Sequence, residues 1–121
     1  MQVAKEGMMS DEWKVEHDLG QYRLMLDHLT AYREKKLGIH ALLSALKGLL
    51  TALESKNGDW FEEAISERAN LEILYAVECD RCEEAGCGFD AVDKVLFELA
   101  SVKRSIQNIE LIARERLGAL S

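Results

Sequence analysis

Apolar residues recur every three or four positions through most of this chain, and that spacing favours α-helices over any other structure. The longest stripe consists of Val92, Val95, Leu96, Leu99, Val102, Ile106, Ile109, Ala113 and Leu117. A stripe with this period covers one side of a helix. The sequence also contains no proline, the residue that most strongly interrupts long helices. An all-α fold is therefore predicted.

Four amphipathic segments follow one another along the sequence. The predicted helices are Asp11–Lys35, Ile39–Ser55, Asp59–Asp80 and Asp90–Leu117. Ser10, Asp59 and Asp90 are residues of the kind that cap helix N-termini. The predicted connections are Lys36-Leu37-Gly38, Asn57-Gly58 and residues 81–89. Short connections between amphipathic helices favour an antiparallel bundle of about four helices.

The length of 121 residues is that of one domain, and 48% apolar residues are enough for a core without metal or disulfides. We predict a single helical domain over residues 10–121. Met8 and Met9 suggest a later start of translation or a loosely held beginning. Residues 1–9 are accordingly predicted to be a flexible N-terminal extension.

Composition also limits the partners. A formal net charge of −7 argues against nucleic acid, because phosphates would be repelled. No basic amphipathic stretch would bind an anionic membrane, and no apolar run approaches the ~20 residues of a membrane span. No signal sequence is visible at the N-terminus. Three cysteines cannot all pair within one chain, so we expect reduced thiols and a cytoplasmic, bacterial-type protein.

Negative charge is concentrated between Asp59 and Glu98. This stretch holds twelve acids and three bases, a net −9, whereas the rest of the chain is +2. Local charge of this kind steers a basic partner and speeds its association. The alternative is a solvated face that only keeps the protein soluble. Trp60, Phe61 and Tyr75 lie in the same stretch, either as core residues or as aromatic anchors of an interface.

Residues that could carry chemistry are few. Cys79, Cys82 and Cys87 form a C-x2-C-x4-C pattern, which lacks the fourth ligand of a zinc site. None of the three histidines follows a glutamate at the spacing of di-iron bundles. No nucleophile signature or phosphate-binding loop is present. We expect no enzyme activity, no cofactor and no metal, with a cysteine-based metal or redox sensor as the less favoured alternative.

Scattered apolar and acidic positions resemble a known class of proteins. They are Asp18-Leu19, Leu29, Tyr32, Leu37-Gly38-Ile39, Leu53-Glu54, Trp60, Leu71-Glu72, Leu74-Tyr75-Ala76-Val77 and Asp80. Over residues 15–117 the chain resembles the small acidic helical immunity proteins of bacterial contact-dependent growth inhibition and polymorphic toxin systems. The cysteine cluster is not part of this resemblance.

The resemblance implies a protein that binds a cognate toxin domain and occludes its active site. Toxins that cut nucleic acid are basic where they hold phosphate, so the partner would be a basic protein. The partner-binding residues would be Glu62, Glu63, Glu67, Glu72, Glu78, Asp80, Glu83, Glu84 and Trp60. The alternative is a self-associating helical adaptor or regulator, a possible homodimer whose long fourth helix forms the dimer seam.

Overall fold

The computed structural model describes the backbone of residues 2–121 and the side chains of residues 12–121 other than Phe89. Over residues 2–121 the chain forms helices and no strand, so the all-α prediction is confirmed. The helices are α1 (Gln2–Arg33), α2 (Ile39–Ala52), α3 (Asp59–Ala85), α4 (Phe89–Glu98) and α5 (Ala100–Leu120). The side chains of residues 1–9 lie outside the described part of the structure. The flexible N-terminal extension predicted for these residues therefore stays a prediction.

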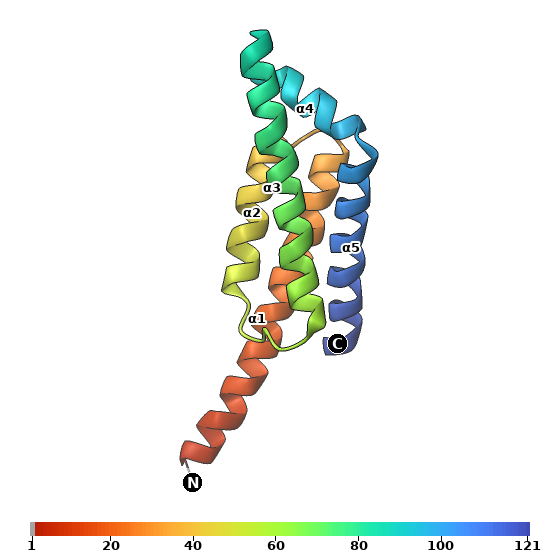
Figure 1. The fold of residues 1–121 in the computed structure, drawn as a ribbon. Helices are drawn as coiled ribbons and strands as arrows, with labels where there is room; N and C mark the ends of the chain where they lie inside the picture. The colour runs from red at the N-terminus through yellow and green to blue at the C-terminus, as the bar shows by residue number, and fades with distance from the viewer. Residues whose placement is uncertain (1) are drawn as a thin grey trace.

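The four longer helices lie side by side, with successive ones running in opposite directions, and the short α4 crosses one end of the group (Figure 1). Helix α1 packs on α2 and α5, and α3 packs on α2, α4 and α5. The beginning of α1 projects beyond the other helices (Figure 1). This arrangement leaves α3 with one side on the core and one side facing outward.

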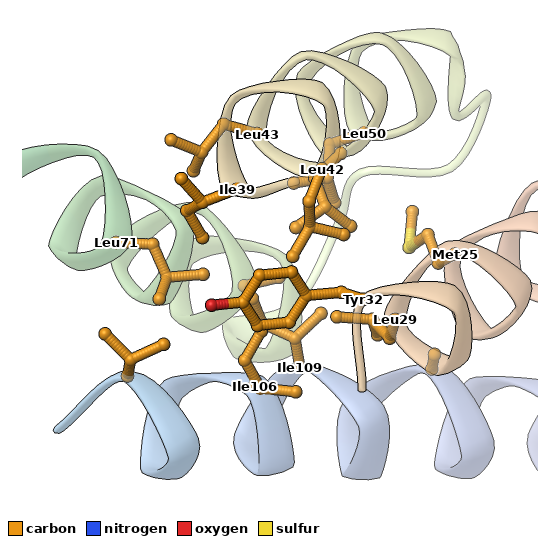
Figure 2. Close-up of a cluster of buried hydrophobic side chains, with 14 of the residues drawn as sticks. Met25, Leu29, Tyr32, Ile39, Leu42, Leu43, Leu50, Leu71, Ile106 and Ile109 are labelled. Atoms are coloured by element: carbon orange, nitrogen blue, oxygen red, sulfur yellow. The ribbon is translucent and has the colours of Figure 1, made fainter. Parts of the chain in front are cut away.

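The core between these helices is built from the predicted apolar stripes. Tyr22, Met25 and Leu29 of α1 are 2% exposed or less, as are Leu42 and Leu46 of α2. Figure 2 shows side chains from α1, α2, α3 and α5 meeting around Tyr32. Burial of large apolar side chains at about 25 cal/mol per Å² is the main stabilising contribution to such a core.

A buried carboxylate fixes the connection between α2 and α3. Asp18 of α1 is only 1% exposed. Its two oxygens accept hydrogen bonds from the backbone N–H groups of Glu54 (2.8 Å) and Ser55 (3.0 Å). Because the carboxylate has these donors, its burial is compensated, and the loop is held against α1.

The predicted fourth helix is wrong, because Leu99 divides it into α4 and α5. Leu99 has an extended backbone (φ −69°, ψ 129°). Neither glycine nor proline lies near this break, so local propensity does not explain it. The break lets α4 turn across the end of the other helices (Figure 1). The long helix proposed as a dimer seam is therefore not continuous.

Several predicted helix ends also differ. Ser10 lies inside α1 rather than at its N-terminus, and α2 ends at Ala52 rather than Ser55. Helix α3 extends beyond Asp80 to Ala85, so the predicted loop over residues 81–89 shrinks to 86–88. Gly86 ends α3 in the left-handed conformation (φ 74°) that glycine adopts at low cost.

The predicted N-cap of the third helix is wrong by one residue. Gly58 occupies the cap position with φ 134°, and Asp59 is the first residue of α3. A side chain at Gly58 would also collide with the Trp60 ring, 2.6 Å from the position of a Cβ. Asp59 still stabilises α3, because a carboxylate in the first turn interacts favourably with the helix dipole.

Candidate partner-binding surface

The sequence of α3 fixes which of its sides faces the core. Ala64, Leu71, Glu78 and Cys82 are its buried residues, spaced by seven, seven and four positions. At 3.6 residues per turn these spacings keep all four on one side of the helix. The opposite side faces outward.

That outward side is the α3 outer face. It is formed by Glu62, Ile65, Ala69, Ile73, Ala76, Val77, Asp80 and Glu84, all of which are exposed. Ile73 is 60% exposed, Val77 is 55% exposed and Ile65 is 43% exposed. Three large aliphatic side chains gathered on one helix face are unusual, because isolated exposed apolar residues need no explanation but clustered ones mark interaction sites.

Three of the predicted acids lie in line with Ile73, and Ile65 and Val77 flank that line. Glu62 precedes Ile73 by eleven positions and Asp80 follows it by seven, both close to whole helical turns. Glu84 lies one further turn along the helix. Glu62 and Asp80 are about 27 Å apart at 1.5 Å per residue. None of the three acids forms an ion pair or side-chain hydrogen bond with the described residues.

Glu63 and Glu83 are also exposed and lie beside this line. Glu72 is exposed as well, but its carboxylate accepts a hydrogen bond from Arg68, at 2.7 Å from Nη1. Arg68 also donates from Nε to the Leu43 carbonyl oxygen at 3.1 Å, which ties it to α2. The charge of Glu72 is therefore partly compensated within the protein.

Glu67 is turned toward α5 instead of outward. Its Oε1 accepts a hydrogen bond from the Ser105 hydroxyl at 3.3 Å, and its Oε2 accepts one from the Asn108 amide. Ser105 is buried, so these bonds lie at the contact between the two helices. Among the acids predicted to bind a partner, Glu67 is the one that joins α3 to α5.

Glu78 is buried, with only 6% of its surface exposed. Its nearest cation is the exposed Arg81, with 3.7 Å between Nη1 and Oε1. A carboxylate in this position contributes little to the field outside the protein. The structure thus separates Glu67 and Glu78 from the acids of the α3 outer face.

Trp60, the predicted aromatic anchor, is half-buried on the inward side at the beginning of α3. The Arg116 guanidinium lies over its ring, 4.4 Å from the centroid. The Tyr22 ring meets it edge-on at 5.9 Å and the Phe61 ring at 5.8 Å. Trp60 therefore lies in an aromatic cluster away from the α3 outer face.

The three cysteines meet at the other end of α3. Cys82 and Cys87 are joined by a disulfide, with 5.1 Å between their Cα atoms, so the prediction of reduced thiols is wrong for this pair. Cys79 is free, and its thiol beside the Tyr75 hydroxyl raises the pKa of Tyr75. Among the described side chains, no group of three or more His, Cys, Asp and Glu residues is arranged to hold a metal ion.

The exposed aliphatic residues Ile65, Ile73 and Val77 were not among the residues predicted to bind a partner. The sequence does contain a signal for them, because the apolar residues of the third helix follow a looser pattern than those of the first two helices. Apolar residues there fall on two sides of the helix, and only the side with Ala64 and Leu71 is buried.

Comparison with known protein families, curated proteins and solved structures finds no match to this chain. The resemblance to immunity proteins stays a prediction made from the residues. Among the described helices, none combines the length and apolar character needed to cross a bilayer.

Proposed function

We propose that this chain is an immunity-type binding protein, without catalysis, that neutralises a basic, nuclease-like bacterial toxin domain by occluding its active site. The observation that carries this proposal is the composition of the α3 outer face. Exposed Ile65, Ile73 and Val77 lie there beside exposed acids that form no ion pair with the described residues.

Each component of the face has a role in this proposal. The aliphatic side chains supply apolar area that a partner can bury, and buried apolar contacts provide most of the binding energy of an interface. The acids around them select a basic surface and accelerate its approach. A toxin groove that holds phosphate presents such a surface, and covering it excludes the nucleic-acid substrate.

The charge of α3 supports a basic partner more than a neutral one. Helix α3 contains nine acids and two bases, a formal −7. Both of its arginines lie within 4 Å of carboxylates of the same helix. Like charges along one helix repel and reduce its stability. A cation supplied by another molecule would remove that repulsion.

The self-associating adaptor has less support. That alternative relied on one long fourth helix, and Leu99 interrupts it. Acids at Glu62, Asp80 and Glu84 on each of two copies would also repel across a symmetric contact through this face.

A pull-down from the native cell tests the proposal. The full chain is used as bait at low salt and again at high salt, and the retained proteins are identified by mass. We expect one basic, toxin-like protein in equal amount to the bait, with less retained at high salt. Capture of an acidic protein, or retention that does not change with salt, would contradict the proposal.

A further inference from the structure

A cleft lies between the α1–α2 connection and α4, and it shares no residue with the α3 outer face. Its volume is about 570 Å³, and its walls include Tyr32, Lys35, Leu37, Asp93, Lys94 and Phe97. Sites for small molecules usually enclose roughly 300–1,000 Å³ and combine apolar walls with a few polar groups. This cleft has that size and that composition.

Lys35 in the cleft wall has a left-handed backbone (φ 62°) because it ends α1. Its N–H donates to the Tyr32 carbonyl oxygen at 3.0 Å, and the N–H of Lys36 donates to the Ala31 carbonyl oxygen at 2.8 Å, which is the Schellman pattern of a helix C-terminus. This cap places the Lys35 side chain at the cleft, with Nζ 4.8 Å from the centroid of the Phe97 ring.

The charges around the cleft are unequally compensated. Asp93 accepts a hydrogen bond from the Ile39 backbone N–H at 2.9 Å, and Glu98 lies 3.8 Å from Lys103. Lys35 and Lys94, in contrast, form no ion pair with the described side chains. In a protein of net charge −7, the cleft therefore offers two cations to a ligand.

The Tyr32 hydroxyl has no hydrogen-bond partner, although the residue is only 4% exposed. Figure 2 shows its oxygen among carbon atoms of neighbouring side chains. Burial, aided by the negative charge of Asp93, raises the pKa of Tyr32 to about 12. The hydroxyl thus keeps its proton at neutral pH and remains a donor without an acceptor, which is a costly arrangement.

We propose that this cleft binds a small aromatic carboxylate. Phe97 and Leu37 provide the apolar walls that a flat ring can contact. Lys35 and Lys94 hold the carboxylate once the exposed Lys35 side chain moves off Phe97. The ligand then supplies the anion that these two cations lack among the described side chains.

The test uses 2-naphthoate as the probe and its neutral analogue 2-naphthamide as the control ligand, titrated into the full chain by calorimetry. We expect one 2-naphthoate per chain and about tenfold weaker binding of 2-naphthamide. Lys35→Gln and Lys94→Gln should each weaken 2-naphthoate about two- to fivefold. Lys47→Gln, an exposed lysine of α2 outside the cleft, should leave its affinity unchanged.

Tyr32→Phe keeps the ring and removes the hydroxyl. Because the hydroxyl is buried and has no partner, this variant should lower neither the unfolding midpoint of the free protein nor its affinity for 2-naphthoate. The proposal is overturned if 2-naphthoate does not bind at about 5 mM, or if 2-naphthamide binds equally well. It is also overturned if Lys47→Gln weakens binding as much as Lys94→Gln.

Discussion

Helices α3 and α5 pack on each other and cover the same core, yet their surfaces differ in charge and in apolar content. Helix α3 holds nine acids and two bases, whereas α5 holds two acids and four bases. The α3 outer face exposes three large aliphatic side chains, but Leu111 is the only one that α5 exposes. A helix in this position thus needs neither excess acid nor an apolar outer face in order to fold.

The charges of α5 are also used differently. Glu110 accepts a hydrogen bond from Arg33 Nε at 2.9 Å, which joins α5 to α1. Helix α3 forms one comparable link to α5, through Glu67, while Glu62, Asp80 and Glu84 remain without partners among the described residues. Only some acids of α3 therefore contribute to the packing of the helices, and Glu62, Asp80 and Glu84 face solvent.

The largest expected effect is a difference in the free energy of unfolding between substitutions of two glutamates on α3. Glu67→Ala removes the acceptor for Ser105 and Asn108 and should lower the free energy of unfolding by about 2–3 kcal/mol. Glu62→Ala, at an exposed position, should change it by no more than about 0.5 kcal/mol. Urea unfolding followed by circular dichroism measures both. Equal effects would mean that the division of α3 into two sides is wrong.

The pH dependence of stability tests the environment of Tyr32 in the core that α3 and α5 both cover. Leu71 of α3 and Ile106 of α5 lie around Tyr32 in Figure 2. With a pKa of about 12 in the folded state, Tyr32 binds its proton more tightly when folded than when unfolded. Stability should therefore fall as pH rises from 10 to 12, by about 2 kcal/mol from this residue. Tyr32→Phe should reduce that fall, and an identical pH profile for the variant would refute the assignment.

The smallest expected effect is a difference in partner affinity between substitutions of two exposed aliphatic residues. Ile73→Ala on α3 and Leu111→Ala on α5 should each change the unfolding free energy by less than about 1 kcal/mol, because both side chains are mostly exposed. Only Ile73→Ala should weaken partner binding, by about tenfold, which corresponds to about 1.4 kcal/mol. Surface plasmon resonance with the captured partner measures this difference. A loss of affinity from Leu111→Ala alone would move the interface to α5.

Apolar spacing predicted the all-α fold and the beginning of α2 at Ile39 from the sequence alone. It could not predict the break at Leu99, which has no glycine or proline beside it and which accompanies the packing of α4 across the other helices. The end of α3 was placed too early, although Gly86 offers the residue type that ends a helix in the left-handed conformation.

The charge pattern directed attention to the acids of residues 59–98 but could not divide them into exposed and inward-facing ones. Glu67, Glu78 and Glu84 look alike in the sequence, and only their angular positions relative to Ala64 and Leu71 distinguish them. The cleft beside α4 left no sequence signal, because tertiary packing alone brings the α1–α2 connection beside α4.

The salt dependence of affinity tests whether the unpaired acids of the α3 outer face bind a basic partner. The variant Glu62→Lys/Asp80→Lys/Glu84→Lys is compared with Glu16→Lys/Asp27→Lys/Glu115→Lys, which changes the net charge equally at exposed acids outside α3. Dissociation constants for the captured partner are measured from low to high salt.

We predict that wild type and the control variant bind tightly at low salt and more weakly as salt rises. The variant altered on α3 should bind weakly at every salt concentration, with little dependence on salt. If instead the two variants lose affinity equally, net charge alone governs binding and the account of the α3 outer face is contradicted.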